Sequence, residues 1–139
     1  IERHQLALLN TVIKKAKESE RAYTCLKMAW IYRGKAESLP EDTPDRKEQI
    51  QELQNQEKEL LENAYTGFEA AFSKESFPMC GMDEITVSYL LAELARRIGR
   101  YEESSRWISR VLISREANER IKNRAREIKE LLNKDMNRA

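Results

Sequence analysis

Apolar residues recur every three or four positions along nearly the whole chain, which is the spacing of one face of an α-helix. No run of alternating β-branched residues is long enough to suggest a sheet. We therefore predict an all-α fold of about six helices, paired in three antiparallel hairpins. The expected helices cover residues 4–18, 19 to 34 or shortly after, 44–72, 84–98, 101–114 and 117–136.

The third expected helix is the longest. With about 29 residues at 1.5 Å each, it spans roughly 43 Å. Its early part, residues 46–59, has only Ile50 and Leu53 as apolar residues. We expect this part to project from the body of the protein, or to pack on one narrow face, with higher mobility than the rest.

Residues typical of helix ends mark several boundaries. Ser19 is a possible N-cap of the second helix, and Thr43 followed by Pro44 is a strong start signal for the third. Asp83 is the expected cap of the fourth helix, and Gly99 its expected left-handed end. The loop over residues 73–82 has no regular pattern but carries apolar residues, so it is either tucked inward or a contact site.

Composition narrows the class of protein. The chain has 139 residues, 35% charged and 40% hydrophobic, which suits a single domain over residues 1–139 and argues against disorder. No apolar run approaches the roughly 20 residues that a bilayer span needs. Two distant cysteines exclude a disulfide framework and favour a cytoplasmic location. Because the chain starts at Ile1, we expect it to be the C-terminal part of a longer protein.

The formal net charge of +1 hides an uneven distribution. Basic side chains exceed acidic ones in residues 1–36 and again in residues 85–139, whereas acidic side chains dominate residues 37–84. Such segments are usually solvated helix faces that attract one another across the fold. A surface that recognises a partner is the alternative.

The sequence offers little material for catalysis or metal binding. His4 is the single histidine, and no local motif activates Cys80 as a nucleophile. Cys25 lies on an apolar helix stripe, where a free cysteine is usually a small buried hydrophobe. The four glycines stand alone and form no phosphate-binding loop. We expect no catalytic residue, no metal and no cofactor, and therefore no enzyme.

The stretch from Tyr89 to Ser104 resembles one tetratricopeptide repeat, in which two antiparallel helices meet at a Gly-x-Tyr turn followed by a small residue. The matching positions are Gly99, Tyr101 and Ser104. The resemblance implies a tetratricopeptide-like, right-handed stack of hairpins.

A second resemblance covers more of the chain. Residues 26–33, Leu-Lys-Met-Ala-Trp-Ile-Tyr-Arg, together with Arg97-Ile-Gly and Trp107-Ile-Ser-Arg-Val, are similar to the C-terminal half of a family of uncharacterised bacterial proteins common in Firmicutes. In that family a cysteine-rich, zinc-binding segment precedes a tetratricopeptide-like half. The resemblance implies an architecture and no assigned activity.

The most informative surface is predicted on the fourth helix. Residues there recur at three- and four-residue steps and are expected to share one stripe opposite the core. They are Thr86, Tyr89, Glu93, Arg96, Arg97 and Arg100. In tetratricopeptide repeats this side of the helix faces the groove.

We expect this stripe to bind a protein or peptide partner, or the rest of the protein's own chain. Tyr89 is expected to give apolar contact, while Arg96 and Arg97 bind carboxylates of an acidic segment. A solvated stripe is the alternative. A basic nucleic-acid-binding accessory domain is the second functional hypothesis, because arginines extend through the last two helices. Self-association through the long third helix stays open.

Overall fold

A computed structural model describes residues 17–138, and every structural statement below concerns this range. It contains α2 (Glu18–Glu37), α3 (Arg46–Lys74), α4 (Glu84–Arg97), α5 (Tyr101–Ile113) and α6 (Glu119–Arg138), and no strand within the described residues. The all-α prediction is confirmed. The first expected helix, residues 4–18, lies almost entirely outside the described residues.

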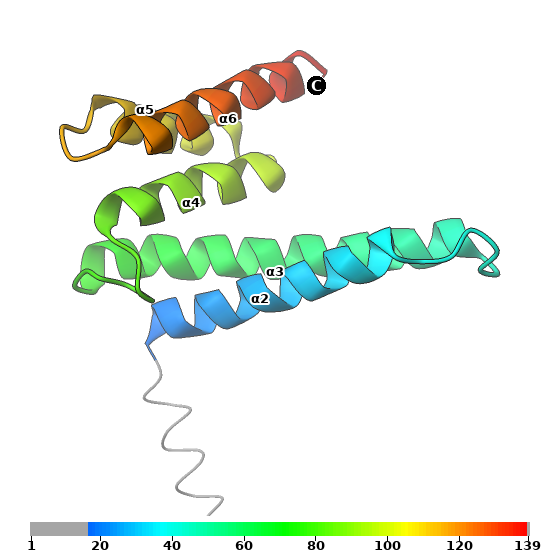
Figure 1. The fold of residues 1–139 in the computed structure, drawn as a ribbon. Coiled ribbons are helices and arrows are strands. Elements are labelled where there is room, and N and C mark those ends of the chain that lie inside the picture. Colours follow the sequence, from blue (N-terminus) through cyan, green and yellow to red (C-terminus); the bar gives the residue numbers. More distant parts are fainter. Residues whose placement is uncertain (1–16, 139) are drawn as a thin grey trace, which may run out of the picture.

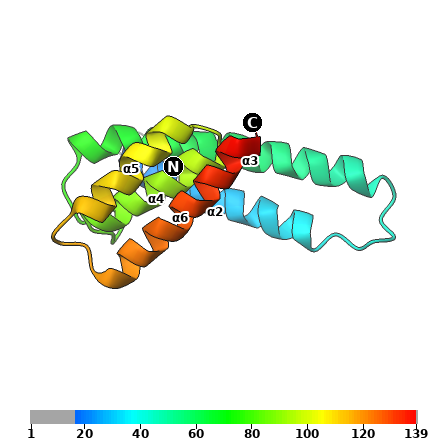
Figure 2. The same cartoon turned by 90° about the horizontal axis from the view of Figure 1, so that it is seen from above.

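The helices form a stack of hairpins (Figure 1). The closest pair is α2 and α3, which run side by side as one long hairpin. Helix α4 packs on α3, α5 packs on α4, and α6 packs on both α5 and α4. Seen from above, the connection between α2 and α3 lies well beyond the other three helices (Figure 2). The early part of α3 therefore projects as expected, with α2 as its packing partner.

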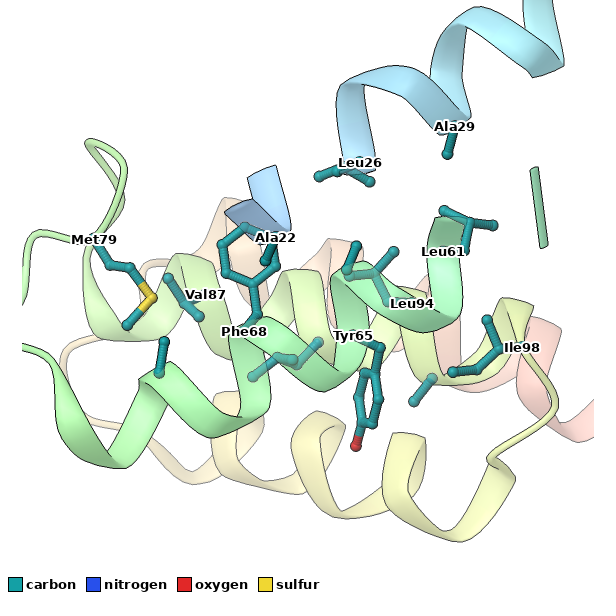
Figure 3. Close-up of a cluster of buried hydrophobic side chains, with 14 residues drawn as sticks. Ala22, Leu26, Ala29, Leu61, Tyr65, Phe68, Met79, Val87, Leu94 and Ile98 are labelled. Carbon is teal, nitrogen blue, oxygen red and sulfur yellow. The ribbon is translucent and has the colours of Figure 1, made fainter. Parts of the chain in front are cut away.

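The main core lies where α2, α3 and α4 meet (Figure 3). Leu26, Phe68 and Leu94, one from each helix, are at most 2% exposed. Met79, from the loop before α4, packs into the same cluster and is also 2% exposed. The loop is thus tucked inward at Met79. Two smaller clusters join α4, α5 and α6.

One expectation for α2 was wrong. The helix begins at Glu18, so Ser19 lies in the first turn, and its hydroxyl donates to Glu75 instead of capping the helix. Trp30 is 47% exposed, because α3 covers only one side of α2. The helix continues past Gly34 to Glu37, since a single glycine weakens a helix without ending it.

The ends of the other helices give a mixed result. Helix α3 begins at Arg46, and its N-cap is Asp45 in the left-handed region with φ 52°, so the predicted start at Thr43 and Pro44 was wrong. Asp83 does cap α4, by accepting a hydrogen bond from the Thr86 amide at 2.8 Å. Gly99 has the expected positive φ, 84°.

Candidate functional site

The six residues predicted on the fourth helix point in three directions. Thr86, Glu93 and Arg97 are seven and four positions apart and stay on one side of α4. Tyr89 is half-buried, in contact with the two clusters that join α4 to α5 and α6. Arg100 follows the end of α4, and its guanidinium lies 5.3 Å from the centre of the Tyr65 ring on α3. The structure therefore keeps only part of the stripe together.

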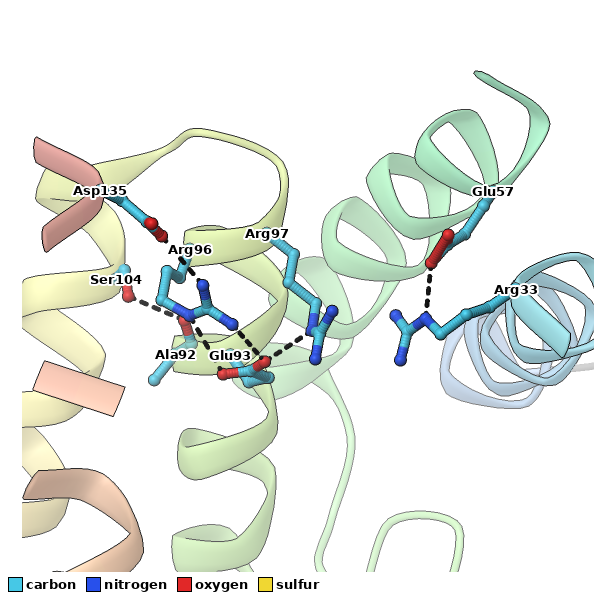
Figure 4. A network of polar contacts seen from close by, with 8 residues as sticks. All are labelled: Arg33, Glu57, Ala92, Glu93, Arg96, Arg97, Ser104 and Asp135. Atoms are coloured by element: carbon cyan, nitrogen blue, oxygen red, sulfur yellow. Dashed lines mark hydrogen bonds and ion pairs between the residues drawn. The ribbon is translucent and has the colours of Figure 1, made fainter. Parts of the chain in front are cut away.

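Arg96 connects α4 to α6 (Figure 4). Its Nη2 donates to Oε1 of Glu93 at 2.8 Å, and its Nη1 donates to Oδ2 of Asp135 at 2.9 Å. The side chain is only 12% exposed. Burial works to lower the pKa of Arg96, but the bonds to Glu93 and Asp135 outweigh burial and raise that pKa above its ordinary value. The guanidinium is thus a fixed positive charge between two helices.

Arg97 is tethered more loosely. Its Nε donates to Oε1 of Glu93 at 2.5 Å, and 39% of its side chain is exposed. Among the described residues, no hydrogen bond of its two terminal nitrogens is found. Glu93 therefore orients Arg97 by one nitrogen and leaves the guanidinium fork available.

A cavity of about 420 Å³ lies where the projecting part of α3 meets the ends of α4, α5 and α6. We call it the corner cleft. It is lined by Gln54, Glu57, Lys58, Leu61, Arg96, Arg97, Tyr101 and Asp135. Only two of these residues, Arg96 and Arg97, belong to the predicted site.

The charges of the corner cleft are partly neutralised from within the protein. Glu57 accepts a hydrogen bond from Nε of Arg33 at 2.8 Å, and Asp135 is held by Arg96 (Figure 4). Lys58 is exposed and forms no ion pair within residues 17–138. The unmatched charge at the surface of the cleft is therefore that of Lys58, and Arg97, although paired with Glu93 through Nε, adds two terminal nitrogens that are still available. Such a site suits a carboxylate.

A second cavity, also of about 420 Å³, lies between α3 and α5 around the buried Tyr65. The Tyr65 hydroxyl lies 2.6 Å from Oε2 of Glu103 and 2.9 Å from Oε2 of Glu69, and it accepts a hydrogen bond from Nε1 of Trp107 at 3.1 Å. Burial, followed by the bond to Glu103, raises the pKa of Tyr65 well above its ordinary value. The sequence pattern gave no signal for these contacts, because Glu103 and Trp107 lie on another helix, 38 and 42 positions away.

The residues considered for catalysis or metal binding are not brought together in the described part of the chain. Cys25 and Cys80 are free, partly exposed thiols, and both pack against the main core cluster. His4 lies outside the described residues. Within residues 17–138 no three histidine, cysteine, aspartate or glutamate side chains are arranged to hold a metal ion. None of the described helices combines the length and the apolar character that crossing a membrane requires.

A family profile described as "Uncharacterized protein conserved in bacteria (DUF2225)" matches residues 1–132. No curated protein and no solved structure matches the chain significantly.

Proposed function

We propose that this chain, which belongs to the family of uncharacterised proteins conserved in bacteria (DUF2225), has a binding function. In this proposal it is a non-catalytic helical scaffold that holds an acidic segment of a protein partner. The corner cleft is the proposed binding site. We further propose that the scaffold is tetratricopeptide-like and acts in the cytoplasm, as expected for a Firmicutes-type protein with a cysteine-rich other half.

The observation that carries the proposal is the pair of available cations at the mouth of the cleft. Arg97 offers its guanidinium fork, which can bind a carboxylate through two parallel hydrogen bonds. Lys58 approaches from α3, on another wall of the same cleft. Two cations on different helices favour an extended segment with more than one carboxylate over a single small anion.

The helices around the cleft are held in a way that supports a preformed site. Ser104 donates a hydrogen bond from its hydroxyl to the carbonyl of Ala92 at 2.8 Å, and it is fully buried. This small residue lets α4 and α5 approach closely, as the likeness to a tetratricopeptide repeat implies. The Arg96–Asp135 bond then fixes the end of α6 against α4. The side of the cleft formed by α4, α5 and α6 therefore loses little entropy when it binds a ligand.

Selection from a displayed random peptide library tests the proposal. We expect the enriched peptides to carry several Asp or Glu residues and to bind the whole chain more weakly as salt rises. Reversing both cations, Lys58→Glu with Arg97→Glu, should weaken binding about tenfold or more, measured by fluorescence anisotropy.

The matched control reverses two exposed cations of α6 that do not line the cleft, Arg120→Glu with Lys129→Glu. This control should keep the affinity of the parent chain. Enriched peptides without acidic residues, or equal binding by both double variants, would remove the corner cleft from consideration.

Nucleic acid is the alternative ligand, and exposed arginines on α5 and α6 are the observation in its favour. Two of them are paired, Arg110 with Glu84 and Arg126 with Glu119. Trp107 is a poor base-stacking platform, since its ring contacts the ring of Phe72 and the guanidinium of Arg110. Titration with oligonucleotides over a salt series decides between the ligands, because phosphate contacts give a steep negative slope.

A further inference from the structure

Residues 22–32 of α2 are apolar on almost every side, yet only one side is covered among the described residues. Nine of the eleven residues from Ala22 to Tyr32 are apolar or aromatic. Ala22, Leu26 and Ala29 face the core and are at most 2% exposed. A helix that is apolar all round is normally buried all round. The remaining sides of α2 therefore need a cover.

The uncovered side is defined by three large residues, Met28, Trp30 and Ile31, which are 43%, 47% and 57% exposed. We call it the outer face of α2. Ile31 follows Ala22 by nine positions, two and a half turns, so it points away from α3. The three side chains cover about 160° of the helix surface, given 100° per residue. A patch of this kind is typical of an interface.

We propose that residues 4–16 of the same chain dock on the outer face of α2 as an amphipathic helix. Their apolar positions, Leu6, Leu9, Val12 and Ile13, recur at helical spacing. They precede α2 directly, so a cover made from them needs no second molecule. The proposal concerns a different surface from the corner cleft and does not depend on the peptide partner.

The length of this segment matches the surface. A helix over residues 4–16 is roughly 20 Å long, and the distance along α2 from Glu18 to Ile31 is also roughly 20 Å. If the chain turns back near Lys17, Leu6 lies level with Trp30, and Ile13 lies level with Ala22 and Tyr23. The largest exposed side chains of α2 thus meet the apolar end of the segment. A shorter segment would leave Trp30 and Ile31 uncovered.

Trp30 is a built-in reporter for this contact. In the full chain carrying Trp107→Phe, Trp30 is the remaining tryptophan, so its emission and its quenching by acrylamide report on the outer face alone. Leu6→Asp with Leu9→Asp places charge in the proposed contact. We expect this variant to shift the emission to longer wavelength and to raise the quenching constant roughly twofold. The matched control, Asn10→Asp with Thr11→Asp, changes polar positions outside the apolar stripe and should have no effect.

A second reporter separates undocking from unfolding. In the chain carrying Trp30→Phe, Trp107 reports on the contacts between α3 and α5, and its emission should be unchanged by Leu6→Asp with Leu9→Asp. Equal quenching of Trp30 in all variants would overturn the proposal. Shielding of Trp30 that grows over an about fiftyfold rise in protein concentration would also overturn it, because a second copy of the chain would then be the cover.

Discussion

Among single residues, Arg96 and Arg97 are neighbours in sequence with different physical roles. Adjacent helical positions point about 100° apart, so Arg96 turns toward α6 while Arg97 stays at the mouth of the corner cleft. Arg96 makes bonds to carboxylates on two helices, whereas Arg97 bonds only to Glu93 on its own helix. Their contributions to stability and to binding should therefore be separable.

Replacing Arg96 by alanine should lower the free energy of unfolding by about 1–3 kcal/mol, because two largely buried carboxylates lose a charged hydrogen-bond donor. Arg97→Ala should cost under about 1 kcal/mol, since more exposed ion pairs contribute little. Denaturation in urea measures both changes. Equal losses for the two variants would mean that the Arg96–Asp135 bond does not hold α6 on α4.

Tyr65 provides a prediction about pH. Its folded-state pKa is raised above the ordinary value of 10.0, so its contribution to stability is fully present below about pH 10 and is lost as the pH rises further. The free energy of unfolding should fall more steeply above about pH 10 in the parent chain than in Tyr65→Phe. Thermal unfolding at a series of alkaline pH values measures the difference. Parallel curves would show that the phenol proton is not linked to folding.

Between elements, α2 and α3 approach each other closely at Gly67. A Cβ atom built on Gly67 would lie 2.8 Å from the Cβ of Ala22. The long hairpin therefore depends on a small residue at this crossing. By contrast, a Cβ on Gly34, in the exposed part of α2, would meet no atom within 4 Å.

These two glycines form a matched pair. Gly67→Ala should destabilise the protein by about 1–3 kcal/mol, because the two helices must move apart. Gly34→Ala should stabilise it by roughly 0.5–1 kcal/mol, because alanine is the better helix former and has room. Urea denaturation of both variants under one condition checks the signs. Stabilisation by Gly67→Ala would contradict the close packing of α2 on α3.

The same elements show how far sequence reasoning reaches. Periodicity located the five helices of residues 17–138 because burial of one stripe is a local property of the pattern. Asp83 and Gly99 were identified because a cap and a positive φ depend on a few neighbouring residues. Ser19 was misassigned because its partner, Glu75, is 56 positions away.

On the scale of the whole molecule, the corner cleft illustrates the same limit. Arg96 and Arg97 were recognisable from their spacing on one helix. Asp135 and Lys58 were not, because each is brought to the cleft by the packing of α6 or by the projection of α3. Likewise, Arg33 and Glu57 are 24 positions apart and meet only because α2 and α3 form a hairpin. Single-sequence patterns do not determine which distant side chains share a cavity.

The projecting part of the hairpin should open more readily than the body of the protein. From residue 46 to residue 60 no side chain of α3 is buried, whereas Leu61, Ala64, Tyr65, Phe68 and Ala71 all are. We expect the amides of residues 46–56 to exchange with solvent at least about tenfold faster than those of residues 61–71. Hydrogen exchange followed by mass spectrometry measures this.

Arg33→Ala should accelerate exchange around Glu57 and leave α4 unchanged, because the Arg33–Glu57 bond joins only the two helices of the hairpin. Since residues 54–58 form one wall of the corner cleft, a bound acidic peptide should slow exchange there. Uniform protection along α3 would mean that its packing on α2 alone is enough to hold this wall rigid.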